Sequence, residues 1–153
     1  YLQKVKRIAK MDMNIETLKL TVDYGVIGLL VFMSFIAVWF FIERIFFYKK
    51  IKIKTYKNKK HLDVALTKHL TIIGTIASNS PYIGLLGTVL AIMLTFMTMS
   101  NGDIEAAKIM SSLALALKAT AVGLVVAIIS MVFYNILSRY AEVLESLYET
   151  EEI

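Results

Sequence analysis

The longest charge-free stretch of this sequence constrains its fold more than any other feature. From Thr71 to Gly102, 32 consecutive residues include no Asp, Glu, Lys, Arg or His. A second charge-free run extends from Tyr24 to Ile42, and a third segment, between Lys108 and Arg139, contains one charge, Lys118. About 20 apolar residues are enough to cross the hydrocarbon core of a bilayer as a helix. Because lipid offers no partners for free backbone groups, each span must be helical. The sequence therefore predicts an all-α membrane protein with three transmembrane helices.

Composition and charge exclude several other classes of protein. Hydrophobic residues make up 58% of the chain, whereas soluble domains contain about 45–50% apolar residues. There is no cysteine, so the chain has no disulfide, thiolate metal site or cysteine nucleophile. The spans contain no paired carboxylates, Ser-His pair or metal cluster, so we expect no enzymatic activity and no cofactor. His61 and His69 are eight residues apart, which fits no short metal motif. The net charge is +5, and the basic residues behind it flank the apolar runs. This placement indicates membrane topology rather than nucleic-acid binding.

The run from Thr71 to Gly102 is too long for a bilayer. As one helix at 1.5 Å per residue it would reach about 48 Å, so we expect it to protrude into water at one end. The polar group from Ser78 to Pro81 lies toward that end. Pro81 suits the first turn of a helix, with Asn79 or Ser80 as the cap, but it also suits a kink in a continuous helix. Both alternatives remain open from the sequence.

The distribution of basic residues predicts the orientation. The linker from Arg44 to His69 holds nine Lys and Arg residues and a single acid, Asp63. Basic residues are in excess on cytoplasmic loops, so we expect the linker and the C-terminus to face the cytoplasm, and the N-terminus and the short turn between the second and third spans to face outward. Five basic residues in the N-terminal flank oppose this orientation, but the linker outweighs them. That flank fits either an amphipathic helix lying on the membrane surface or a solvated arm.

These features divide the chain into seven segments. The first span is rich in aromatic residues and is expected to face lipid. The segments are the basic, periplasmic N-terminal flank (1–20), the first transmembrane helix (21–48), the basic cytoplasmic linker (49–71), the second transmembrane helix with a cytoplasmic extension (72–100), the periplasmic turn (101–108), the third transmembrane helix (109–138) and the acidic cytoplasmic C-terminal helix (139–153).

The second and third spans each carry a stripe of small and hydroxyl residues at spacings of three and four. Such stripes let membrane helices approach closely, and they can also line an ion path in an assembly of several copies. Plain packing is the simpler interpretation, and the residues alone leave both open. The second and third spans contain no Asp or Glu, so a second polypeptide must supply the acid of any proton relay there. The stripes are Ser80, Gly84, Thr88, Ala91, Thr95 and Thr98 in the second span, and Ala116, Thr120, Gly123, Ala127, Ser130 and Tyr134 in the third.

Two runs of sequence resemble a known family. The run from Ala77 to Val89 resembles the second-span signature of the ExbB/TolQ/MotA proton-channel family, and the run from Leu117 to Ile128 resembles its third-span signature. The three-span layout is similar too, and the likeness is greatest to short ExbB-type members, followed by TolQ. The resemblance covers roughly residues 20–140, in the order and on the spans that the family requires.

The resemblance implies a homopentamer in the bacterial inner membrane. Its second and third spans would enclose an ExbD-like single-span partner that supplies an intramembrane Asp, and the work of proton flow would pass to a TonB-like protein that opens outer-membrane transporters. A TolQ-type subunit of the Tol-Pal system and a self-contained small oligomeric ion channel are the alternatives. Membrane lipids are further expected partners, and nucleic acid is not.

Candidate site residues follow from the stripes and the resemblance together. Thr88 and Thr120 match family threonines that line the pore. The expected ion pathway consists of Thr88, Thr120, Thr95 and Ser80, and the expected packing positions are Gly84, Gly87, Ala91, Gly123, Ala127 and Pro81.

The chain also departs from the family pattern at three positions. Leu115 stands where relatives often have a Glu, and Ile129 stands where a Pro is usual. Lys118 places a positive charge near that missing Glu. A proton route through a third-span Glu is therefore in doubt for this chain, and Lys118 is expected to extend toward the outer headgroups.

Overall fold

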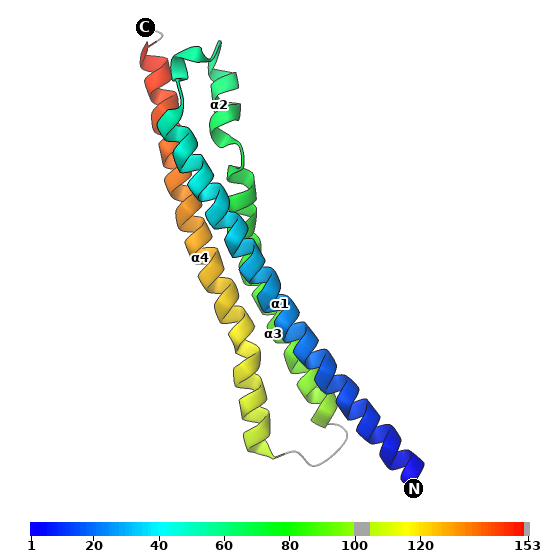
Figure 1. The fold of residues 1–153 in the computed structure, drawn as a ribbon. Coiled ribbons are helices and arrows are strands. Elements are labelled where there is room, and N and C mark those ends of the chain that lie inside the picture. Colours follow the sequence, from blue (N-terminus) through cyan, green and yellow to red (C-terminus); the bar gives the residue numbers. More distant parts are fainter. Residues whose placement is uncertain (100–104, 152–153) are drawn as a thin grey trace. The chain divides into compact units, whose positions relative to one another are not determined.

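Three long helices carry most of the chain. The computed structural model describes residues 1–99 and 105–151. In the described residues, three helices are long and apolar enough to cross a membrane, which confirms the prediction of a helical, multi-pass membrane protein. The elements, in chain order, are α1 (Leu2–Lys50), the short 3-10 helix η1 (Ile53–Thr55), α2 (Lys59–Thr67), α3 (Leu70–Met99) and α4 (Ala106–Glu151) (Figure 1).

The N-terminal flank and the first span form one continuous helix. α1 runs without a break through residues 20 and 21, where the two segments were expected to meet. On either side of this point, Thr17 Oγ1 donates to the Met13 carbonyl and Thr21 Oγ1 donates to the Thr17 carbonyl, both at 2.9 Å. The flank is thus not a separate helix but a continuation of the first span, and its residues 1–14 are exposed.

Pro81 lies inside α3 and does not begin a helix. Of the two alternatives for this proline, the continuous helix is therefore the observed one. Proline has no N–H to bond the carbonyl four residues earlier, which normally weakens a helix interior. Short polar side chains bond α3 carbonyls in the preceding turns, since Asn79 Nδ2 donates to the Thr75 carbonyl at 2.8 Å and Thr75 Oγ1 donates to the Thr71 carbonyl at 2.7 Å.

The third span and the acidic tail also form one helix, α4. Of the turn expected at residues 101–108, positions 101–104 lie outside the described residues, and α4 begins at Ala106. Two compact units are distinguished: unit 1 contains Tyr1–Val31 and Ser80–Val125, and unit 2 contains Phe32–Asn79 and the chain from Val126 onward.

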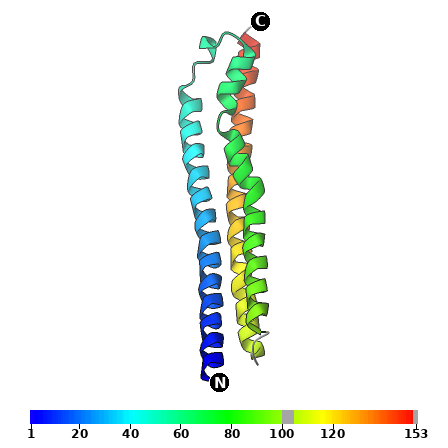
Figure 2. The ribbon, with the colours of Figure 1, turned by 90° about the vertical axis from the view of Figure 1, so that its right-hand side faces the viewer.

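Within unit 2, the basic linker folds into ordered structure. Asn58 caps α2, because its side-chain oxygen accepts a hydrogen bond from the His61 N–H at 2.9 Å. Figure 2 shows η1 and α2 following the end of α1. α2 ends at Thr67, and His69 then adopts a positive φ of 68° before α3 begins. The linker therefore contains a helix that the sequence analysis did not anticipate.

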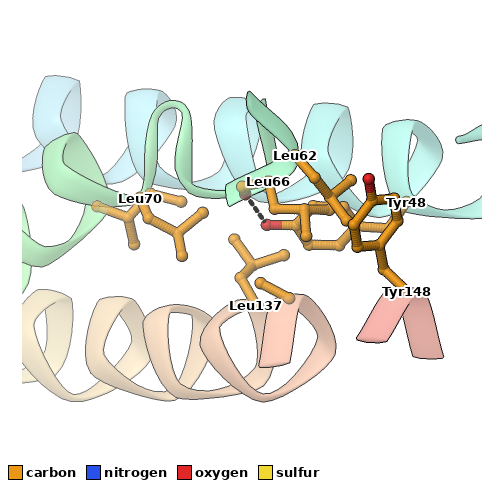
Figure 3. Packing of buried hydrophobic residues seen from close by; sticks show 8 residues of the cluster. Tyr48, Leu62, Leu66, Leu70, Leu137 and Tyr148 are labelled. Atoms are coloured by element: carbon orange, nitrogen blue, oxygen red, sulfur yellow. Dashed lines mark hydrogen bonds between the residues drawn. The ribbon is translucent and has the colours of Figure 1, made fainter. Parts of the chain in front are cut away.

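The buried apolar cluster of unit 2 explains why α2 forms there. Leu62 and Leu66 of α2 are 0% and 1% exposed, and Leu137 of α4 is 0% exposed. The Tyr48 hydroxyl donates to the Leu66 carbonyl, as the dashed line in Figure 3 marks. Fully burying a leucine contributes about 1.5–3 kcal/mol, so these contacts stabilise a nine-residue helix that would be marginal alone.

Candidate functional site

The candidate site lies in unit 1, where α3 and α4 pack against each other. Thr88 and Thr120 point toward one another across this contact, with their hydroxyl oxygens 2.6 Å apart. Thr88 Oγ1 also lies 2.8 Å from the Ala116 carbonyl oxygen. One arrangement satisfies both distances: Thr88 donates to Ala116 and accepts from Thr120. The two spans are thus joined by a short chain of hydroxyl hydrogen bonds.

Two glycines allow the helices to come this close. A Cβ atom at Gly84 would lie 2.6 Å from the Ala119 carbonyl oxygen, and one at Gly123 would lie 2.6 Å from the Ser80 carbonyl oxygen. Real Cβ atoms essentially never approach other atoms closer than 3.0 Å. Glycine is therefore required at both positions for this helix contact, as in other closely packed membrane helices.

Gly87 allows α3 to approach α1 closely in the same way. A Cβ atom there would lie 2.8 Å from Val26 Cγ1 and 3.1 Å from Ala119 Cβ. Gly87 therefore faces α1 and α4 together, and all three long helices meet at this level of unit 1. The close approach places the small-residue stripe of α3 inside the unit.

A cavity of about 200 Å³ lies beside Ala91. Ala116 and Leu115 of α4 line it, and so do charged residues of α1, among them Asp23. Leu115 is one of the positions at which the sequence analysis expected a departure from the family pattern. Carboxylates of α1 therefore reach the cavity that this leucine lines. The complete lining is Glu16, Lys19, Leu20, Asp23, Ala91, Ser112, Leu115 and Ala116.

The other predicted residues are placed differently. Thr95 is buried but donates within its own helix, to the Ala91 carbonyl at 2.9 Å. Ser80 is fully buried, and Pro81 beside it is half-buried. Ala127 is buried in unit 2, whereas the threonine pair belongs to unit 1. The structure therefore brings together Ser80, Gly84, Thr88, Thr120 and Gly123, and it does not join Thr95 or Ala127 to them.

The threonine pair has partners inside one chain. Thr88 is 5% exposed, and Thr120 is half-buried. Both hydroxyls also lie 3.3 Å from the Gly84 carbonyl oxygen. This geometry serves helix packing directly, while the half-exposed Thr120 leaves one side of the pair open. The pore-lining role of these residues stays a prediction.

A second polar group, in unit 2, escaped the sequence analysis. Arg44 is 3% exposed and forms a bidentate ion pair with Glu43, at 2.6 and 2.7 Å. Its remaining terminal nitrogen donates to the Ala65 carbonyl of α2 at 2.9 Å. Glu43 also lies 3.2 Å from His69 Nδ1. The sequence signal was present, since Glu43 and Arg44 directly follow the first apolar run, but only Arg44 entered the topology argument and Glu43 was not considered.

The fold and the site define a class: a three-span helical membrane protein whose second and third spans are held together through glycines and hydroxyls. Residues 39–150 match the family model described as the MotA/TolQ/ExbB proton channel family. The chain belongs to this family, as the two signature runs predicted.

Relatives of similar length support this assignment. The chain is 50% identical over 139 residues to the "Biopolymer transport protein ExbB" of Aquifex aeolicus, covering 90% of this chain and 93% of the relative. It is 50% identical over 128 residues to the "Putative biopolymer transport protein ExbB-like 2" of Helicobacter pylori, covering 83% and 85%. To the "Tol-Pal system protein TolQ" of Haemophilus influenzae it is 40% identical over 85 residues, covering 55% and 37%.

Proposed function

We propose that this chain is the scaffold subunit of a proton-driven energy converter of the bacterial inner membrane. Five copies would assemble with their α3 and α4 segments around the transmembrane helices of a single-span, ExbD-like partner. The partner's intramembrane Asp would carry the proton, because the second and third spans of this chain, residues 72–100 and 109–138, contain no carboxylate. The role is mechanical and ion-conducting rather than enzymatic.

The observation that carries the proposal is the Thr88–Thr120 hydroxyl pair within the family-matched segment. A hydroxyl can donate to an ionised carboxylate and can accept from a protonated one. A shared hydroxyl pair at a helix contact therefore suits a site that meets a carboxyl group in both of its states. The half-exposed side of Thr120 is where a partner's Asp would approach.

The coupling to outer-membrane transport is part of the same proposal. Relatives that match most of the chain, in Aquifex aeolicus and Helicobacter pylori, are named for biopolymer transport, which favours work delivered through a TonB-like protein. A TolQ-type role in a Tol-Pal system is the second candidate, because the TolQ of Haemophilus influenzae matches 55% of the chain.

Co-purification tests the proposal. The tagged full-length chain is expected to bring down a neighbouring single-span protein with an intramembrane Asp, and to restore energised uptake in a strain that lacks its own ExbB-type subunit. Restoration of Tol-Pal function alone would favour the second candidate. Purification without any such partner, together with failure in both strains, would contradict the proposal.

A further inference from the structure

The junction between α2 and α3 holds an unusual residue. His69 has a φ of 68°, a conformation that residues other than glycine rarely adopt, although histidine, asparagine and aspartate tolerate it better than most. Its carbonyl begins α3 by accepting from the Ile73 N–H at 3.3 Å. Non-glycine residues in sparsely populated conformations are concentrated at functional and switching sites.

The His69 side chain is held by α1. Its Nδ1 atom lies 3.2 Å from Glu43 Oε2, and its ring lies 4.3 Å from the Phe40 ring, centroid to centroid. The side chain of His69 is 25% exposed and that of Glu43 is 37% exposed. Water therefore reaches this contact between the two side chains, although it is partly shielded.

Glu43 connects His69 to α2 through a buried cation. The same carboxylate that faces His69 also pairs with Arg44, which donates to the Ala65 carbonyl in the last turns of α2. The Arg44 guanidinium additionally lies 4.2 Å from the Phe47 ring centroid. The position of α2 on α1 thus depends on the carboxylate that the imidazole approaches.

The charges around His69 come from each neighbouring element. α1 contributes the anion Glu43 and, bound to it, the cation Arg44. Lys68, the C-cap of α2, precedes His69 directly. The C-terminus of α2 favours a cation at this point and the N-terminus of α3 disfavours one. These two helix ends oppose each other, so the close contact with Glu43 is the specific attraction.

We propose that His69, Glu43 and Arg44 form a proton-sensitive clamp that holds α2 against α1 more tightly when His69 is protonated. The imidazole of histidine changes charge between pH 5 and 8 when unperturbed. A neutral imidazole donates to the Glu43 carboxylate only when its ring proton is on Nδ1, whereas the protonated ring always donates there and adds the attraction between opposite charges. Uptake of one proton at His69 therefore strengthens the His69–Glu43 contact, which ties the residue after α2 to α1 and acts beside the Arg44–Ala65 hydrogen bond.

The clamp does not depend on the proposed transport role. Only the compartment in which the clamp would act rests on the proposed function. With the linker in the cytoplasm, α2 would be held more tightly against α1 when the proton concentration rises at the inner face of the membrane. Loss of the clamp with uptake unchanged would leave the transport proposal intact, and a failed uptake assay would leave the clamp measurable in detergent.

Hydrogen exchange of the α2 amides tests the clamp. The full-length chain in detergent is compared at pH 6 and pH 8, with exchange corrected for the intrinsic effect of pH. We expect protection of α2 to be about two- to fivefold higher at pH 6, the range for a partly exposed ion pair. The difference should shrink in concentrated salt, which screens such pairs.

Two substitutions and a matched control identify the responsible residue. His69→Asn keeps a residue that tolerates positive φ but cannot titrate, and Glu43→Gln removes the anion, so both should abolish the pH dependence. His61→Asn removes the other histidine of the chain, which lies on the exposed side of α2, and should leave it unchanged. If His69→Asn does not fold, His69→Gly replaces it, because glycine adopts positive φ readily. Equal α2 protection at both pH values in the unsubstituted chain, or pH dependence that persists without His69, would overturn the proposal.

Discussion

At the scale of single residues, the contact between Gly84 and Gly123 sets how closely α3 and α4 approach. A Cβ atom at Gly84 would come within 3.0 Å of Thr120 Cα as well as meeting the Ala119 carbonyl. These are backbone atoms, which cannot move aside as the end of a flexible side chain can. Separating the helices would also separate the Thr88 and Thr120 hydroxyls.

We therefore expect Gly84→Leu to disrupt the α3–α4 contact and to prevent assembly. Overpacking a tight interior typically costs about 1–3 kcal/mol and more where backbone must shift. Gly28→Leu is the matched control, because a Cβ atom at Gly28 meets nothing within 4 Å. Size-exclusion chromatography and thermal unfolding in detergent measure the difference. Equal behaviour of the two variants would show that this helix contact is not needed.

The threonine pair makes a second prediction at the residue scale. Replacing Thr88 and Thr120 with valine keeps their shape and removes the hydrogen bonds between the helices. An interhelical hydrogen bond in a membrane contributes about 0.6 kcal/mol on average. We expect the double variant to fold and assemble with a slightly lower unfolding temperature. Loss of the folded protein would instead mean that the pair serves stability above all.

At the scale of the element, α2 depends on one buried face. Leu62 is 0% exposed, whereas Val64, two positions along, is 64% exposed. Leu62→Ala should destabilise unit 2 by about 2–5 kcal/mol, the range for large-to-small changes in a core. Val64→Ala should change stability by less than about 0.5 kcal/mol, as surface substitutions do. Limited proteolysis within residues 49–71 would report the difference, and similar cleavage of both variants would contradict this packing.

The N-terminal end of α2 forms ion pairs with α4. Lys59 of α2 forms ion pairs with Glu149 and, at 3.6 Å, with Glu145. The hydrogen bond from Lys59 to Glu149 is the main cause that raises the pKa of Lys59 above its ordinary value. A raised lysine pKa stabilises the folded state fully below the unfolded pKa, about 10.4, and this contribution is lost as the pH rises through the folded pKa.

Lys59→Gln should therefore loosen the end of α2 at neutral pH and low salt only. Because the lysine is exposed, the effect should disappear at high ionic strength. Arg139→Gln is a suitable comparison, since it removes an exposed ion pair within α4 alone, that with Glu142. Hydrogen exchange near the end of α4 measures the effect, and a loss of protection that persists in high salt would show another cause.

The elements also show how far the sequence could predict the structure. The three spans could be predicted from their charge-free runs, because lipid permits few alternatives to a helix. α2 could not be predicted in this way, since only two of its residues, Leu62 and Leu66, are buried, and their partners Tyr48 and Leu137 are distant in sequence. Spacing placed Thr88 and Thr120 on stripes, but it could not show that the two hydroxyls bond each other.

At the scale of the whole molecule, the orientation in the membrane is open to a direct test. The chain has no cysteine, so single cysteines at Thr55 and Ser100 can be probed with an impermeant thiol reagent on intact cells. We expect labelling at Ser100 and none at Thr55, because nine basic residues should keep the linker in the cytoplasm. The reverse pattern would show an inverted topology.

The assembled complex makes the final prediction. A carboxyl group that loses its polar partners is buried at an added cost of a few kcal/mol. Each 1.4 kcal/mol added to the barrier slows proton transfer about tenfold. Proton flux through vesicles that contain this chain and its Asp-bearing partner is the quantity to measure, under an imposed pH gradient. The unsubstituted complex should conduct, and the complex with Thr88→Val and Thr120→Val should assemble equally but conduct at least about tenfold less. Equal flux from both complexes, at equal protein content, would contradict the ion-transfer role of the threonine pair and leave helix packing as its function.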